Sequence, residues 1–148
     1  MDKLELGYNI PAVKGMCINE IQTPCLVIDY SVFKDNLIKM KNFCNKNDVM
    51  LRPHAKMHKS IQIAKTQINI GGAHGICCQK VSEAEVFARS GIKDILITNQ
   101  ICDPLKIERL VKIALLGCTI SCCVDNFQNV LDIQKFAKQF NVIINIFV

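Results

Sequence analysis

Short apolar runs alternate along this chain with longer segments whose apolar residues recur at helical spacing. From the second run onward the runs recur roughly every 20 to 25 residues, as expected of successive βα units. The pattern therefore predicts parallel strands joined by helices. The apolar runs are Cys25–Ile28, Val49–Leu51, Gly75–Cys78, Ile95–Thr98, Thr119–Val124 and Val142–Val148.

The segments between the later runs carry signals that begin and end helices. Each of three helices is preceded by residues able to cap its free backbone N–H groups. These signals are the capping-box pair Ser82 and Glu85, then Asp103 with Pro104, then Asp125 with Asn126. Gly91 and Gly117 are placed to end the first two helices. For Asp125 this pattern favours a cap over an acid or base role.

Parallel strands joined by helices form either a doubly wound sheet or a (β/α)8 barrel. The short regular repeat, without a glycine-rich first turn, favours the barrel. A complete barrel has eight strands and about 250 residues, whereas this chain supplies about five strands after its first apolar run. We therefore predict an α/β fold, a partial (β/α)8 TIM barrel over residues 23–148, after a lead-in over residues 1–22. Its open strand edge is expected to attract a partner chain or to aggregate.

Composition and charge narrow the class of protein. The chain has 148 residues, half of them apolar, which is enough for the core of one domain or part of one. The net charge of +5 comes from scattered lysines, so neither a nucleic acid nor a membrane surface is indicated as a partner. No apolar run approaches the ~20 residues that span a bilayer. The densest basic stretch, Arg52–Lys59, suits a small anion such as phosphate.

The nine cysteines do not indicate a disulfide framework or a zinc site. The chain begins Met1-Asp2-Lys3 without an apolar signal segment, and it contains no C-x-x-C spacing. The pairs at Cys77–Cys78 and Cys122–Cys123 lie within apolar runs. We therefore expect a cytoplasmic protein whose cysteines act mainly as small core residues.

The candidate chemistry lies just after the strands, because a barrel gathers its active site at the carboxyl ends of its strands. In Leu51–Lys59, strand alternation would place Arg52, His54 and Lys56 on one side. Burial and nearby positive charge would lower the pKa of a lysine there and leave a nucleophilic amine. The alternative is that Lys56, His58 and Lys59 are loop residues in water.

Polar residues follow the later strands as well, at Gln79–Lys80, Asn99–Gln100 and Asp125–Asn126. Each of these pairs also has a structural explanation as a turn or a helix cap. His54 and His58 are four residues apart, but they lie in a strand and a loop rather than on a helix. No metal ligands are predicted in this chain.

The stretch Leu51–Lys59 resembles the cofactor-lysine motif of the D-threonine aldolase and D-serine dehydratase family of pyridoxal-phosphate enzymes. Further blocks of sequence agree with that family in order and spacing. They are Thr23–Asp29, Gly75–Glu85 and Asp94–Asn99, and the lead-in Pro11–Met16 is more similar to the aldolase branch. The resemblance extends from about Pro11 to Val148 and is densest around Lys56.

The resemblance implies a fold type III enzyme, in which an alanine-racemase-like N-terminal barrel holds pyridoxal 5'-phosphate and a C-terminal β domain completes the site. Lys56 would then be the catalytic Schiff-base lysine, and His58 would assist proton transfer. The other cofactor-binding residues predicted beside Lys56 are Arg52, His54, Gln79 and Asn99. The implied substrate is a D-3-hydroxy amino acid, which undergoes Cα–Cβ cleavage or loses its β-hydroxyl, and a complete enzyme is expected to be a homodimer.

In that family the phosphate-binding loops, the groups around the pyridine ring and the divalent-metal ligands lie mostly beyond the position of Val148. The C-terminal β domain is expected to be absent, so the chain is predicted to be weakly active or inactive. The alternatives are a racemase of the same fold, a non-catalytic pyridoxal-phosphate-binding protein, or a remnant that needs a complementary chain.

Overall fold

The computed structural model describes residues 12–148. Met1–Lys3, used above for localisation, and Pro11 of the lead-in lie outside the described residues. The chain divides into two units, Met1–Phe33 and Lys34–Val148. In the first unit the described part contains a 3₁₀ turn at Ile18–Glu20, and helix α1 (Tyr30–Lys46) crosses the boundary between the units.

The first apolar run does not form a strand. Cys25–Ile28 lacks strand structure, and Leu26 is fully exposed. A strand exists only where a neighbouring strand takes up its backbone hydrogen bonds, and no such pairing is formed by this run. The prediction of a strand here was therefore wrong, because a local apolar pattern does not supply a pairing partner.

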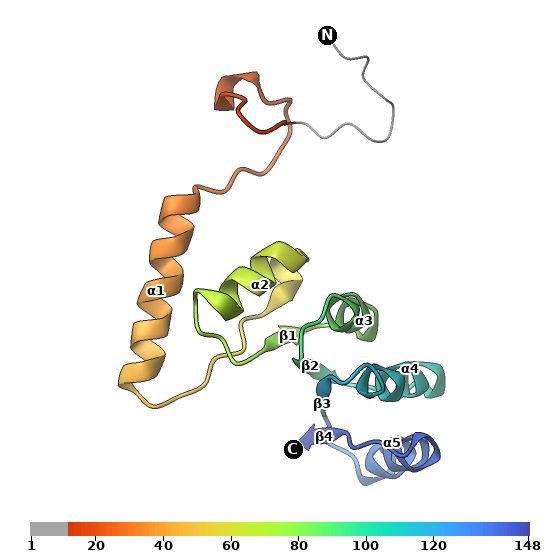
Figure 1. The fold of residues 1–148 in the computed structure, drawn as a ribbon. Coiled ribbons are helices and arrows are strands. Elements are labelled where there is room, and N and C mark those ends of the chain that lie inside the picture. Colours follow the sequence, from red (N-terminus) through yellow and green to blue (C-terminus); the bar gives the residue numbers. More distant parts are fainter. Residues whose placement is uncertain (1–11) are drawn as a thin grey trace. The chain divides into compact units, whose positions relative to one another are not determined.

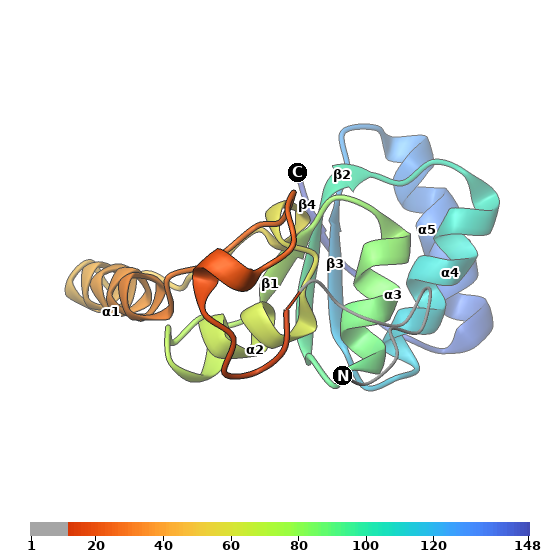
Figure 2. The ribbon, with the colours of Figure 1, turned by 90° about the horizontal axis from the view of Figure 1, so that it is seen from above.

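The second unit contains a parallel sheet in the order β1-β2-β3-β4 (Figure 1). The strands are β1 (Ile76–Cys78), β2 (Asp94–Gln100), β3 (Thr119–Cys123) and β4 (Asn145–Phe147). Successive strands are joined by α3 (Val81–Arg89), α4 (Pro104–Ala114) and α5 (Phe127–Phe140), and α2 (Ile61–Asn69) precedes β1. The three connecting helices cover the same face of the sheet (Figure 2). This one-sided cover is that of a partial (β/α) barrel, because a doubly wound sheet carries helices on both faces.

The prediction that Val49–Leu51 forms the first barrel strand was also wrong, because these residues form no strand. The segment after them is extended and lies beside β1, where the Pro53 carbonyl accepts a hydrogen bond from Cys77 N (2.8 Å). His54 forms only an isolated parallel bridge with Cys77. Pro53 has no N–H to donate, which interrupts a regular ladder. The sheet among the described residues therefore has four strands rather than about five.

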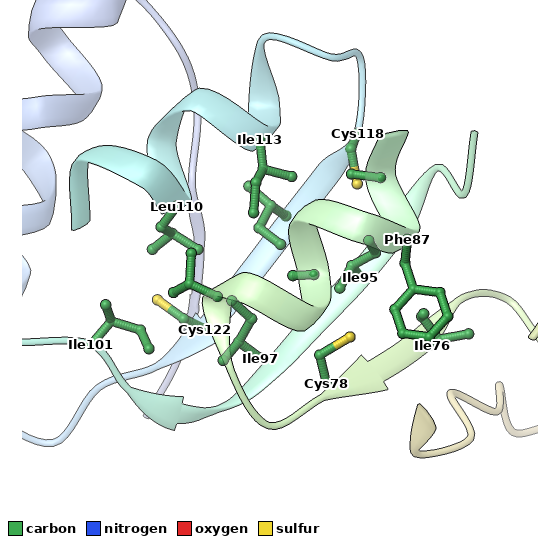
Figure 3. Close-up of a cluster of buried hydrophobic side chains, with 14 of the residues drawn as sticks. Ile76, Cys78, Phe87, Ile95, Ile97, Ile101, Leu110, Ile113, Cys118 and Cys122 are labelled. Atoms are coloured by element: carbon green, nitrogen blue, oxygen red, sulfur yellow. The ribbon is translucent and has the colours of Figure 1, made fainter. Parts of the chain in front are cut away.

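The core lies between the sheet and helices α3 and α4 (Figure 3). Alternate strand residues point into it, as period-two packing requires. They are Ile76, Cys78, Ile95, Ile97, Ile120 and Cys122, and they meet Phe87, Leu110 and Val111 from the helices. Burying each large apolar side chain contributes about 1.5–3 kcal/mol. Burial also raises the pKa of Cys78 to about 12 and that of Cys122 to about 11, so these thiols act as core residues.

The cap of α3 differs from the predicted capping box. The helix begins at Val81, and the carboxylate that caps it belongs to Glu83. Its Oε2 accepts hydrogen bonds from Gln79 N (2.9 Å) and Lys80 N (3.3 Å). Glu85 instead pairs with Arg109 on α4. The sequence contains acidic residues at neighbouring positions, so the pattern located the helix start but not the capping residue.

The caps of α4 and α5 follow the sequence more closely. Asp103 Oδ1 accepts from Lys106 N (2.9 Å), as predicted. At α5 the cap is Asn126, whose Oδ1 accepts from Gln128 N (2.8 Å). Asp125 accepts instead from the Gln100 side chain, so it is not the cap. No helix in the described part of the chain has both the length and the apolar character needed to cross a membrane.

Candidate active site

Lys56 lies in a 3₁₀ turn, Ala55–Met57, at the carboxyl end of the extended segment that accompanies β1. Ala55 is fully buried, and its carbonyl accepts hydrogen bonds from His58 N (3.3 Å) and Lys59 N (2.8 Å). The Lys56 side chain is exposed. Because the chain turns after His54, Lys56 does not continue the strand alternation from which its position was predicted. The turn nevertheless places the amine beside the residue that follows β1.

That residue is Gln79, whose Oε1 accepts a hydrogen bond from Lys56 Nζ (3.4 Å). Gln79 is held at both ends of its backbone. Its N–H donates to Glu83, and its carbonyl accepts from Asn99 Nδ2 (2.7 Å). Three of the predicted site residues, Lys56, Gln79 and Asn99, therefore form one hydrogen-bonded group at the carboxyl edge of the sheet.

His54 is adjacent to this group in the chain, and both of its ring nitrogens make polar contacts within the protein. Nδ1 accepts from Lys56 N (3.3 Å), and Nε2 is 3.1 Å from Thr98 Oγ1. Because Nδ1 accepts, the neutral ring carries its proton on Nε2 and donates it to Thr98. The Thr98 hydroxyl in turn donates to the Cys78 carbonyl (3.3 Å). Burial lowers the pKa of His54, the Lys56 charge lowers it further, and Glu83 opposes both.

Thr98 was not identified as a site residue from the sequence. It ends the apolar run Ile95–Thr98 and lies on the face of β2 opposite the buried Ile97. Alternation along that strand could have placed it on the same sheet face as His54. The pairing itself joins residues 44 positions apart, and no local signal indicates it.

Arg52 does not join the Lys56 group. Its guanidinium forms an ion pair with Asp94, including a hydrogen bond from Nη2 to Oδ2 (3.1 Å), which raises the pKa of Arg52. Asp94 is the first residue of β2, so the pair lies at the end of the strand away from Asn99. His74 Nε2 is 3.4 Å from the same carboxylate. Arg52 thus connects the start of the segment 52–56 to β2, whereas Lys56 lies at its other end.

His58 also does not join the Lys56 group. Its Nδ1 accepts from Ser60 N (3.0 Å), and its Nε2 is buried without a hydrogen-bond partner. Burial lowers the pKa of His58, and the side chain of Gln67 on α2 opposes that shift. Within residues 12–148, no hydrogen bond connects His58 to Lys56 or Gln79.

Residues 28–148 match the model of the alanine racemase N-terminal domain. The chain belongs to the alanine racemase N-terminal domain family. The resemblance identified from the Lys56 motif and its neighbouring blocks is therefore confirmed, as is the barrel fold class.

Two curated relatives and one crystal structure are similar to this member of the family. The 3-hydroxy-D-aspartate aldolase of Paracoccus denitrificans is 46% identical over 144 residues, covering 97% of this chain and 37% of that protein. The D-threonine aldolase of Arthrobacter sp is 42% identical over 138 residues, covering 93% of this chain and 36% of that enzyme. The crystal structure of D-threonine aldolase from Filomicrobium marinum superposes with a TM-score of 0.91 at 37% identity, over 95% of this chain and 37% of that one. The chain thus spans little more than a third of the length of these relatives.

A hollow of about 480 Å³ opens beside the group in this alanine racemase N-terminal domain. It reaches Gln79 and Asn99 and continues between the first turns of α3 and α4, but Lys56 does not line it. Among the described residues, no cluster of three or more histidine, cysteine, aspartate or glutamate side chains is arranged to hold a metal ion. The group therefore presents a solvent-accessible amine, Lys56 Nζ, which donates a hydrogen bond to the amide oxygen of Gln79 at the edge of the sheet.

Proposed function

We propose that this chain is the lysine-bearing part of a pyridoxal-phosphate-dependent lyase that acts on D-3-hydroxy amino acids. The observation that carries the proposal is the placement of Lys56 Nζ at the carboxyl edge of the sheet, 3.4 Å from Gln79 Oε1. Barrel enzymes build their active sites at that edge. The two curated relatives support the reaction class, because they are named as aldolases of 3-hydroxy-D-aspartate and D-threonine.

In this proposal the residues around Lys56 have distinct roles. The Lys56 amine would hold the cofactor covalently through the aldehyde group of the cofactor. Gln79 orients the amine through its Oε1, and Asn99 fixes the backbone of Gln79. When bound, the cofactor would supply an electron sink for bond cleavage at the substrate Cα. An exposed primary amine beside a neutral acceptor fits the covalent attachment of an aldehyde.

The remaining predicted residues fit the site less directly. Arg52 is bonded to Asp94, and His54 uses both ring nitrogens within the protein. These contacts support bracing roles rather than contacts with the cofactor. The residues that hold the cofactor phosphate and any divalent metal are proposed to lie outside these 148 residues, and by themselves the 148 residues are expected to be weakly active or inactive. The proposed complete enzyme is a homodimer.

The test is covalent trapping. The purified protein is incubated with pyridoxal 5'-phosphate, reduced with borohydride and mapped by peptide mass spectrometry. We expect one dominant adduct, on Lys56, and its loss in Lys56→Ala with an unchanged circular dichroism spectrum, since the Lys56 side chain is exposed.

The matched control is Lys59→Ala, which removes a neighbouring lysine whose side chain is 67% exposed. This variant should keep the adduct on Lys56. Labelling spread evenly over Lys59 and other surface lysines, or an undiminished adduct in Lys56→Ala, would contradict the assignment of Lys56.

A further inference from the structure

Two histidines flank Lys56, and each makes the same local hydrogen bond. His54 Nδ1 accepts from the backbone N–H of Lys56 (3.3 Å), and His58 Nδ1 accepts from that of Ser60 (3.0 Å). In both cases the ring nitrogen bonds the N–H two residues further along the chain. Asparagine and aspartate make this bond in Asx turns, where a side-chain acceptor fixes a short non-helical turn. The Lys56 turn is therefore bracketed by two acceptors of the same kind.

The far side of each ring faces a different element. His54 Nε2 donates to Thr98 on β2, whose hydroxyl is itself bonded to the Cys78 carbonyl. His58 Nε2 is buried, and Oε1 of Gln67 on α2 is a second buried atom without a partner. Because each Nδ1 accepts a hydrogen bond, each neutral ring carries its proton on Nε2. His54 thus connects the turn to β2, whereas the buried Nε2 of His58 has no hydrogen-bond partner within residues 12–148.

The turn has few hydrogen bonds of its own beyond the two that the Ala55 carbonyl accepts. It comprises three residues, Ala55–Met57, and a 3₁₀ turn of that length has few hydrogen bonds of its own. Lys59, which follows it, has a φ of 48°, a left-handed conformation that costs a non-glycine residue of order 1 kcal/mol or more. The bond between His58 and Ser60 spans Lys59, and the bond between His54 and Lys56 spans Ala55.

We propose that His54 and His58 are positioning residues, which act as neutral backbone acceptors that hold the Lys56 turn and so direct the Lys56 amine toward Gln79. This inference rests on the proposed function, since it names the residues that serve the cofactor lysine. The sequence suggested that His54 contacts the cofactor and that His58 transfers a proton. In this proposal both rings instead hold the turn in position. A flexible lysine gains reactivity when its amine is held in one place before the reactant arrives.

The test compares two amides at each histidine position. In His54→Asn the amide oxygen takes the place of Nδ1 and can still accept from Lys56 N. In His54→Gln the amide lies one bond further out, at the place of Nε2, so it can reach Thr98 but not Lys56 N. His58→Asn and His58→Gln form the corresponding pair for Ser60 N. Within each pair the two variants are both neutral amides, and they differ only in the distance of the amide group from the backbone.

The first readout needs no cofactor. Nitrogen NMR of the imidazole rings should show both histidines neutral at pH 7.5, with the proton on Nε2. Amide hydrogen exchange at Lys56 should be about fivefold faster in His54→Gln than in His54→Asn, as expected for the loss of one hydrogen bond of about 1 kcal/mol. Exchange at Ser60 should separate the two His58 variants in the same way. Equal exchange within both pairs, or a proton on Nδ1 in either ring, would overturn the inference.

Thr98 provides a second route if a glutamine variant does not fold. Thr98→Val keeps the shape of the side chain but removes the partner of His54 Nε2, so Lys56 N should exchange several-fold faster. Thr98→Ser should restore slow exchange. Unchanged exchange in Thr98→Val would mean that the ring of His54 does not hold the turn through β2.

The second readout is the ratio of borohydride-trapped cofactor on Lys56 to that on the exposed Lys80. This ratio should fall several-fold in the two glutamine variants and stay near the wild-type value in the two asparagine variants. If the wild-type protein traps no excess on Lys56 while the exchange rates differ as predicted, the proposed function fails and the positioning role stands. If the wild-type protein labels Lys56 and the glutamine and asparagine variants behave alike, the positioning role fails and the proposed function stands.

Discussion

At the scale of single residues, the charged groups around the Lys56 turn are mostly paired with one another. Arg52 and Asp94 illustrate this, because their side chains are only 23% and 12% exposed and bond through Nε and Nη2 of the guanidinium. Gly75 allows the close approach, since a Cβ at this position would collide with the Asp94 carboxylate. A basic stretch that looked free in the sequence thus contains an ion pair that connects it to β2.

Removing one member of this pair should destabilise the protein. We expect Arg52→Met to lower the free energy of unfolding by about 1–3 kcal/mol, because it leaves a mostly buried carboxylate short of a charged donor. Urea denaturation measures the change. In a double-mutant cycle with Asp94→Asn, the double variant should lose less than the sum of the two single losses. Strict additivity would show that the two side chains do not interact in solution.

The two histidines make stability depend on pH. Burial lowers the pKa of both below the ordinary value of 6.5, and the charge of Lys56 also lowers that of His54, whereas Glu83 raises it. Below pH 6.5 the unfolded chain therefore binds protons that the folded protein does not. The histidine contribution to stability is fully present above that pH and is lost progressively as the pH falls through 6.5 toward the lower folded values.

Urea unfolding at pH 7.5 and at pH 5.5 measures this effect. The wild-type protein should lose stability between the two values, and the double variant His54→Asn, His58→Asn should lose less. His74, which lies near Asp94 and is more exposed, remains in both proteins as an internal reference. An equal loss in the wild-type protein and the double variant would contradict the assignment to these two rings.

At the scale of elements, helix ends are set by individual side chains within a few residues. The start of α5 provides a clear case, because Asn126 Oδ1 accepts from both Gln128 N and Asn129 N. The neighbouring Asp125 makes no such bond and instead accepts from Gln100 on β2. The two adjacent residues therefore have different roles that the sequence pattern could not separate.

Substitution of these two residues should have unequal effects. Asn126→Ala should cost about 1 kcal/mol, the usual value for the loss of an N-cap. Asp125→Ala should cost only a few tenths of a kcal/mol, since an exposed side-chain hydrogen bond contributes little. Chemical denaturation of both variants measures the difference, and a larger loss in Asp125→Ala would reverse the cap assignment.

At the scale of the whole molecule, the sheet has an unpaired edge in the second unit. Among residues 12–148, β4 pairs only with β3, and its Ile146 and Phe147 are exposed. An exposed apolar strand edge offers free N–H and C=O groups to another chain. The sequence-based expectation of an open edge is consistent with this arrangement.

A charge on the edge should reduce self-association. We expect Phe147→Lys to lower the concentration-dependent increase in mass measured by light scattering, because an edge lysine opposes strand addition. Leu105→Lys is the matched control, since Leu105 is exposed on α4 away from the edge. If both variants reduce association equally, net charge rather than the β4 edge is responsible.

The sequence by itself determined the features that depend on near neighbours. The βα alternation, the cap at Asp103 and the burial of Cys77, Cys78 and Cys122 follow from spacing and side-chain chemistry, and the structure agrees with them, whereas Cys123 is only partly buried. The motif around Lys56 also identified the family, because a run of specific residues can be recognised without knowledge of the tertiary structure. Local hydrogen bonds and side-chain periodicity act over a few residues, so they leave a readable pattern.

Only the tertiary structure decided which distant residues meet. The bond of His54 to Thr98 joins positions 44 residues apart, and that of Arg52 to Asp94 joins positions 42 apart. The same dependence explains why Val49–Leu51 is not a strand, since strand formation needs a partner able to continue the ladder. Apolar patterning indicates that a segment can be buried. The hydrogen-bond partner of its backbone, or of a histidine ring, depends on how the elements pack together, and the sequence of one segment does not specify that packing.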